Sequence, residues 1–253
     1  MRPYILAETN WNVLQNESFD IAVLPWGATE AHNYHLPYAT DVYEADYVAA
    51  AAAQFAWEKG AKVIVLPAIP FGVNTGQSDI YLDINLNPST QLAILNDIIT
   101  VLNRQGINKL LILNSHGGND FKSLLRELGL KFPDMFLCLA NWFKMSDKMD
   151  FFDNEGDHAD EMETSIMLYL RPDLVLDKSF WGEGKEKSNK ITGFKEGWAW
   201  TERKWSKVTT DTGIGNPILA SQKKGKRFFE EVTKRVGNLI YDLYKADVND
   251  LYE

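Results

Sequence analysis

The segment ATEAHNYHLPYATD, from Ala28 to Asp41, gathers side chains that could do chemistry. It holds two of the four histidines of the chain, His32 and His35, together with Glu30 and Asp41. Imidazole and carboxylate groups together suit Zn, Mn or Fe(II), whereas a purely oxygen-based set would suggest Mg or Ca. The alternative is a polar loop in which these residues occur together by chance. The positions of the other histidines and carboxylates distinguish a functional site from such a loop.

The other two histidines also follow predicted strands. His116 lies in NSHGGN, at the end of the apolar run 109–118, and His158 lies in GDHADEMETS, after the run 135–143. In open parallel sheets, ligands bind beyond the carboxyl ends of the strands. Because all four histidines fall at positions consistent with one such end, the sequence predicts a shared site rather than scattered surface residues.

Local geometry favours carboxylate ligands in this site. Glu30 and His32 are two residues apart, so their side chains point the same way in an extended segment. Asp41 stands at the start of the next predicted helix, where it is either a ligand or a residue favoured by the helix dipole. Glu163 lies in METSIMLYL, which is apolar on almost every side, and a buried, unpaired charge there would be costly. We therefore expect Glu163 to be a ligand, the alternative being a solvent-facing residue at a helix start.

Apolar runs and helical periodicity predict the elements that position these residues. Four continuous apolar runs are typical of parallel strands covered on both faces, at 21–28, 62–72, 109–118 and 135–143. Helices are predicted over 42–59, from Asn87-Pro88 to about Gly106, over 120–130, and along an apolar face from Phe229 to Leu243. This alternation predicts an α/β fold with a parallel sheet and right-handed crossovers.

Residues 171–216 interrupt this alternation. The segment carries Trp181, Trp198, Trp200 and Trp205 among glycines and charges, and it has little core of its own. We interpret it as a loop-rich excursion from one domain that spans 1–253. Its simplest role is a packed surface flap, and the functional alternative is a wall of the active site or a contact between subunits.

The composition excludes several classes of protein. The net charge of -9 argues against nucleic acid or an anionic membrane as a partner, and no apolar run reaches membrane-spanning length. The N-terminus lacks the apolar core of a signal peptide, and the single cysteine, Cys138, cannot form an internal disulfide, so both fit a cytoplasmic location.

The Gly117-Gly118 pair lacks a P-loop lysine and the dinucleotide glycine pattern, so it does not indicate a nucleotide site. We interpret it as a close backbone approach that lets His116 and Asn119 face the site.

Four motifs carry a resemblance to the creatininase family. They are E-x-H-x-x-H-L-P-x-x-T-D from Glu30 to Asp41, NSHGGN from Asn114 to Asn119, HADEMETSIML from His158 to Leu168 and, more weakly, GIGNPILASQKKG from Gly213 to Gly225. The resemblance implies a single-domain, three-layer α/β/α fold with a mainly parallel sheet. It also implies metal-dependent hydrolysis of carbon–nitrogen bonds in amides, and a homo-oligomer that is hexameric in the enzyme that gave the family its name.

The same resemblance assigns roles to individual residues. It implies metal ligation by Glu30, His32, Asp41 and His116, with Asp41 able to bridge two ions, and it places His158 near the substrate. This chain differs from the family's namesake in three ways. The namesake has a glutamate ligand at the position of Gly118 and a glycine at the position of Asn33. It also closes two tryptophans over its substrate, and only Trp142 matches one of them in this chain. Glu163 is the natural substitute for the missing ligand. These differences argue against creatinine as the substrate, and other members hydrolyse formamides or cleave a small precursor peptide.

The resulting hypothesis is metal-assisted hydrolysis of a small-molecule cyclic amide or formamide. One or two divalent ions (Zn, Mn or Fe) would activate water as the nucleophile, and His158 or Glu163 would move the proton to the leaving nitrogen. Asn119, Trp142 and His35 are the expected substrate contacts, although His35 could equally orient a ligand or be an ordinary loop histidine. The alternatives are a peptidase-type member of the family, a non-catalytic metal or small-molecule binding protein on the same scaffold, and a nucleotide-binding α/β protein.

Overall fold

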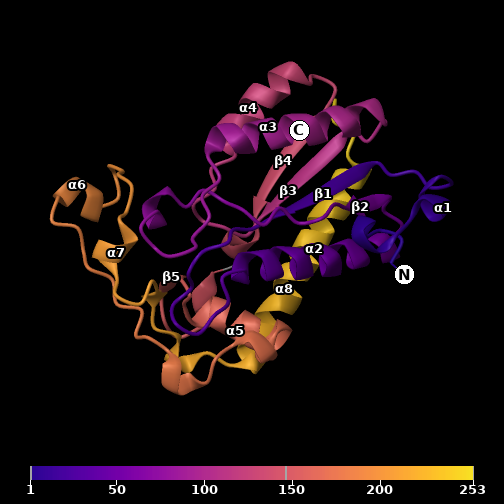
Figure 1. The fold of residues 1–253 in the computed structure, drawn as a ribbon. Helices are drawn as coiled ribbons and strands as arrows, with labels where there is room; N and C mark the ends of the chain where they lie inside the picture. The colour runs from indigo at the N-terminus through magenta and orange to yellow at the C-terminus, as the bar shows by residue number, and fades with distance from the viewer. Residues whose placement is uncertain (1, 146, 253) are drawn as a thin grey trace.

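A parallel four-stranded sheet forms the centre of the protein (Figure 1). The computed structural model describes residues 2–145 and 147–252. The strand order is β2-β1-β3-β4, with every neighbouring pair parallel. The four apolar runs predict these strands correctly: β1 Ile21–Trp26, β2 Val63–Val65, β3 Lys109–Asn114 and β4 Phe136–Asn141. β2 is shorter than its apolar run because Pro67 and Pro70, which have no N–H to donate to a ladder, soon follow it.

Helices cover both faces of the sheet. Side chains alternate along a strand, so Val23 and Leu111 pack on one face and Leu24 and Ile112 on the other. The first face is covered by α2 Thr40–Glu58, α5 Glu161–Leu170 and α8 Gln222–Lys245, and the second by α3 Pro88–Arg104 and α4 Lys122–Lys131. The predicted three-layer α/β/α architecture with a mainly parallel sheet is confirmed.

Local sequence explains how these helices end and pack. Gly60 follows α2 with φ +94° and donates its N–H to the carbonyl of Trp57 at 2.8 Å, a backbone conformation that glycine adopts readily just after a helix. Pro88 is the first residue of α3, as predicted. On α8, an added Cβ at Gly237 would lie 2.6 Å from the ring of Phe55 on α2, so glycine allows the two helices to approach closely.

Short elements complete the chain. They are α1 Trp11–Leu14, α6 Thr192–Lys195, α7 Trp205–Val208, the antiparallel pair β5 Gly156–His158 and β6 Ile214–Gly215, and 3-10 turns at Leu6–Glu8, Thr75–Gln77, Trp142–Lys144, Lys148–Asp150, Pro172–Leu174, Lys178–Phe180 and Pro217–Leu219. In Figure 1, α6 and α7 extend away from the sheet. The division into one domain, 1–253 with an excursion over 171–216, stays a prediction. Within the described residues, no helix is both long enough and apolar enough to cross a membrane.

Candidate metal centre and active site

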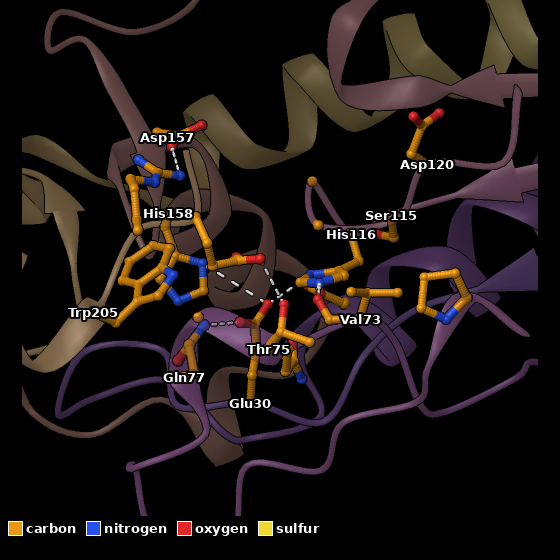
Figure 2. Close-up of a pocket in the computed structure, with 18 of the residues that line it drawn as sticks. Glu30, Val73, Thr75, Gln77, Ser115, His116, Asp120, Asp157, His158 and Trp205 are labelled. Carbon is orange, nitrogen blue, oxygen red and sulfur yellow. Dashed lines mark hydrogen bonds and ion pairs between the residues drawn. The ribbon is translucent and has the colours of Figure 1, made fainter. Parts of the chain in front are cut away.

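A cavity of about 660 Å³ opens beyond the carboxyl ends of β1 and β3 (Figure 2). Five of the predicted site residues line it: Glu30, Asp41, His116, His158 and Glu163. His32 is fully buried and holds its Nε2 atom 3.0 Å from Oδ1 of Asp41. The structure therefore brings together the predicted metal ligands, although they come from three separate segments of the chain.

Of the three groups of described residues that could hold a metal, one joins Glu30, His32 and His158, and the other two, called the ligand sets below, share Asp41. The first set is Glu30, Asp41 and His116, and the second is His32, Asp41 and Glu163; in each set, one ligand atom per residue lies within 4.8 Å of the others. Nδ1 of His116 lies 2.7 Å from Oε1 of Glu30 and 3.0 Å from Oδ2 of Asp41. The two oxygens of Asp41 thus face different histidines, which is the arrangement a carboxylate needs in order to bridge two ions.

Backbone carbonyls fix the orientation of both histidines. Nδ1 of His32 donates to the carbonyl of Glu30 at 3.0 Å, and Nε2 of His116 donates to the carbonyl of Val73 at 3.0 Å. The opposite ring nitrogen of each histidine is left facing the carboxylates. Hydrogen bonds of this kind orient metal-binding histidines and set their tautomer.

Gly118 makes the contact between His116 and Val73 possible. A Cβ added at Gly118 would lie 2.4 Å from the Val73 carbonyl oxygen and 2.5 Å from Nε2 of His116, whereas one added at Gly117 would meet no atom within 4 Å. The close backbone approach predicted for this glycine pair is therefore found at its second member. No side chain, including the glutamate of the family's namesake, fits at position 118 in this conformation.

The second ligand set contains the two carboxylates for which the sequence left alternatives. Asp41 does not cap α2, because its Oδ1 atom faces His32 and the N-cap residue of the helix is Ala39, which makes no side-chain capping bond. Glu163 is buried rather than solvent-facing, and it accepts a hydrogen bond from the N–H of Ala159. Both carboxylates point inward, as the ligand interpretation predicts.

Buried charge makes this cluster fit a metal. Burial disfavours the imidazolium form of His32, but Asp41, Glu163 and Glu30 outweigh burial and raise its pKa to about 10. Burial likewise opposes the charge on His116, and Glu30 and Asp41 again raise its pKa well above the usual value. In this structure, protons on the two histidines balance the buried acids.

Two of the buried acids, Asp41 and Glu44, have carboxyl oxygens without a hydrogen-bond partner among the described residues. Oδ2 of Asp41 has no hydrogen-bond partner among the described residues, because its contact with His116 lacks hydrogen-bond geometry. Burial raises the pKa of Glu163 to about 8, although His32 opposes that rise. Glu44, one helical turn after Asp41, is fully buried with neither carboxyl oxygen bonded to a described residue. Two imidazoles, three carboxylates and an unbonded buried oxygen form a donor set that fits Zn, Mn or Fe.

His158 lies beside the ligand sets with one ring nitrogen free. Its Nε2 donates to the carbonyl of Ala31 at 2.8 Å, and its Nδ1 lies 4.0 Å from Oε1 of Glu30 (Figure 2). Its ring centroid lies 4.2 Å from that of His32 and 4.7 Å from that of Trp205. Burial and the charge of His32 lower the pKa of His158, so this histidine is neutral at pH 7 and its Nδ1 can accept a proton.

The three expected substrate contacts lie behind the cavity wall. His35 bonds through Nε2 to the hydroxyl of Thr164 at 2.9 Å and stacks on Trp181. The amide of Asn119 is occupied by three hydrogen bonds, to Val73, Gln91 and Asn114.

Trp142 is a core residue, 1% exposed, whose indole N–H donates to Ser115 at 3.0 Å. None of the three lines the cavity. In this structure each of the three holds a wall residue or its neighbour, and their role as substrate contacts stays a prediction.

The segment 171–216 supplies a wall of the cavity that the sequence did not assign residue by residue. Trp200, Arg203 and Trp205 line the cavity from this segment, and Gln77 lines it from the opposite loop, donating to Glu30. The cluster of tryptophans in 171–216 was the feature of the sequence that could have indicated this wall. The active-site-wall interpretation of 171–216 is thus the one that the geometry favours over a plain surface flap.

Comparison with known proteins agrees with this geometry. The creatininase family model, described as creatinine amidohydrolase, matches residues 7–240. The chain is similar to a solved structure from Bacteroides fragilis described as a "Putative creatinine amidohydrolase", with a TM-score of 0.93 and 38% identity over 100% of both chains. The mycofactocin precursor peptide peptidase of Mycolicibacterium smegmatis is 24% identical over 220 residues, 84% of this chain and 81% of that relative. A solved structure described as creatininase with Mn shares the fold at a TM-score of 0.76 and 20% identity, over 96% of this chain and 99% of the other.

Proposed function

The chain belongs to the creatininase family and is a hydrolase, and we propose that it cleaves a carbon–nitrogen bond in a small, non-peptide amide. The observation that carries this proposal is the sharing of Asp41 between two ligand sets, with the free nitrogen of His158 beside them. A protein that only stored metal would have no need for a neutral histidine at the edge of the cavity.

Two divalent ions fit the two ligand sets. Glu30, Asp41 and His116 would hold one ion, and His32, Asp41 and Glu163 the other, so that Glu163 takes the place of the ligand missing at Gly118. When bound, ions at such positions supply Lewis-acid chemistry that activates water and polarises an amide carbonyl. The donor set suits Zn, Mn or Fe, and a solved member of the same fold is described with Mn.

A side chain of the protein would transfer the proton from water to the leaving nitrogen. His158 is held in one tautomer by the carbonyl of Ala31, so that Nδ1 faces the cavity and can accept a proton from water and pass it to the leaving nitrogen. Glu163, the other candidate, already accepts the N–H of Ala159 and belongs to a ligand set. We therefore assign the proton transfer to His158 and metal ligation to Glu163.

We place a small amide ahead of a peptide because bulky side chains stand beside the ligand sets. Trp205 packs against His158, and Arg203, which also lines the cavity, is paired with Asp157 at 2.7 Å. Creatinine is disfavoured because Trp142 is in the core and does not close over the cavity. Peptide cleavage remains the second candidate, favoured by the resemblance to the mycobacterial peptidase.

An assay panel tests this proposal. Protein loaded with Zn, Mn or Fe is offered creatinine, cyclic amides, formamides and short peptides, and metal content is measured alongside turnover. We expect turnover of a cyclic amide or a formamide, and loss of both metal and turnover in His32→Ala and His116→Ala. Unchanged metal content in both variants would contradict the proposed centre, and turnover of peptides alone would favour the second candidate. A homo-oligomer, hexameric by family resemblance, and a cytoplasmic location are further expectations, and light scattering on the purified protein tests the first.

A further inference from the structure

A second hollow adjoins the metal cavity and has the opposite charge. It measures about 1060 Å³, and three acids line it, Asp157, Glu186 and Glu202. The cations that line it are Lys187, Lys190, Lys195, Arg203, Lys204 and Lys207. The lining of the metal cavity has the reverse balance, because Arg203 is its one lysine or arginine among the described residues and it faces six acids. The lysine-lined hollow therefore concentrates positive charge in a chain whose net charge is -9.

The two hollows share a rim. Asp157, Trp200, Thr201, Glu202 and Arg203 line both of them. Trp200 is 81% exposed, so its aromatic ring is accessible to a molecule bound at the rim. The same five residues therefore border both the metal cavity and the second hollow, so a molecule that crossed them would reach both.

The lysines of this hollow are free to bind a ligand. Arg203 is already paired with Asp157 at 2.7 Å and with Glu186 at 3.7 Å. By contrast, none of the five lysines forms an ion pair with a residue that the structure describes. A group of unpaired cations in a concave surface attracts anions and raises their local concentration.

Several contacts hold the rim in place beside the metal cavity. Thr75 donates its hydroxyl to Glu202 at 2.7 Å, and Ser206 donates to Asp79. An added Cβ at Gly76 would lie 2.3 Å from the carbonyl oxygen of Arg203, so the two segments touch through their backbones. The lysine-lined hollow is thus positioned relative to the reacting centre and does not hang from a free loop.

We propose that the lysine-lined hollow is a subsite for an anionic group, a carboxylate or a phosphate, carried by the amide substrate. The amide would lie at the ligand sets, its linker would cross the shared rim along Trp200, and its anionic end would meet the lysines. This inference rests on the proposed amide hydrolysis, but binding at the subsite can be measured without turnover.

Matched substrates and matched variants test the subsite. The substrate pairs are succinamate with butyramide, for a carboxylate, and N-formyl-O-phosphoethanolamine with N-formylethanolamine, for a phosphate. The variant K190Q/K195Q removes two exposed charges of the hollow, and K223Q/K234Q removes the same charge from the exposed side of α8. We expect KM for the anionic amide to rise about fivefold in K190Q/K195Q only, as for the loss of two solvent-exposed ion pairs. The pair that responds identifies the anion.

The outcome separates the subsite from the reaction. Equal KM changes for neutral and anionic amides, or equal effects of the two double variants, would overturn the subsite while leaving amide hydrolysis in place. If none of the four amides turns over, calorimetry with succinate and with inorganic phosphate on the metal-loaded protein decides the matter. Binding weakened about fivefold in K190Q/K195Q alone would keep the subsite and count against the proposed reaction. No difference between the double variants would overturn the subsite.

Discussion

The metal centre and the lysine-lined hollow lie side by side but are built in opposite ways. The centre is buried: Glu30, His32 and Asp41 are at most 1% exposed, and each side chain is held by more than one neighbour. The hollow is a surface of exposed lysines on the segment 186–208, with one ion-paired arginine at its edge. On our proposals, the buried part performs the chemistry and the exposed part selects the substrate.

Asp41→Asn gives the largest expected effect, because it removes the one charge that both ligand sets share. We expect loss of bound metal and a fall in activity of at least about 10³-fold, since water is no longer activated. Metal analysis and steady-state kinetics measure this. Asp120→Asn, which alters an acid that lines the same cavity outside both sets, is the control and should keep its metal.

His158→Gln separates proton transfer from metal binding. We expect kcat to fall about 10²-fold, the usual contribution of a general acid–base group, while metal content stays at the wild-type level. A variant that lost its metal would show that His158 is a ligand, as its proximity to Glu30 and His32 also allows.

Metal affinity should rise with pH. The pKa values of His32 (about 10) and His116 are raised in the metal-free protein, so both rings carry protons at neutral pH and must lose them to bind a metal. Glu163, whose pKa is raised to about 8, also carries a proton below that pH. Binding therefore displaces more than one proton, and the apparent affinity should rise by more than about 10-fold per unit between pH 6 and 8. Competition with a chelator at pH 6, 7 and 8 measures this slope, and a flat profile would show that the rings are neutral before metal arrives.

Gly118→Ala tests whether His116 needs its backbone support. The added methyl group would collide with Nε2 of His116 and the carbonyl of Val73, so we expect metal affinity to fall about 10-fold or more, as for other losses of a histidine's supporting contact. Gly117→Ala, where the methyl group meets open space, is the matched control. Similar affinities in the two variants would argue against this account of the glycine.

Thr75→Val gives the smallest expected effect and concerns the shared rim. It removes the hydroxyl that donates to Glu202 and leaves the ligand sets untouched, so we expect KM to rise about threefold with no change in metal content. Thr100→Val, on α3 away from the cavity, is the control. A change in metal content would show that the rim and the centre are not independent.

The sequence predicted the buried half of the molecule better than the exposed half. Continuous apolar runs determined the four strands, and the carboxyl-end rule brought Glu30, Asp41 and His116 together although they are far apart in the chain. The apolar surroundings of Glu163 predicted its burial, since a charge there requires a partner.

The substrate contacts could not be predicted in the same way. Trp142 lies in the core because it follows β4 on the face covered by α8, and that depends on strand register. Trp205 and Arg203 reach the cavity because residues 202–206 pack on the loop 75–79, a long-range contact with no periodic pattern in the sequence.

The central claim is that Asp41 bridges two metal positions. A crystal structure of Mn-loaded protein, with an anomalous difference map collected at the Mn edge, tests it directly. We predict two peaks that share Asp41, one bound by Glu30 and His116 and the other by His32 and Glu163. A single peak that leaves Asp41 uncoordinated, or no peak within reach of these residues, would contradict the account.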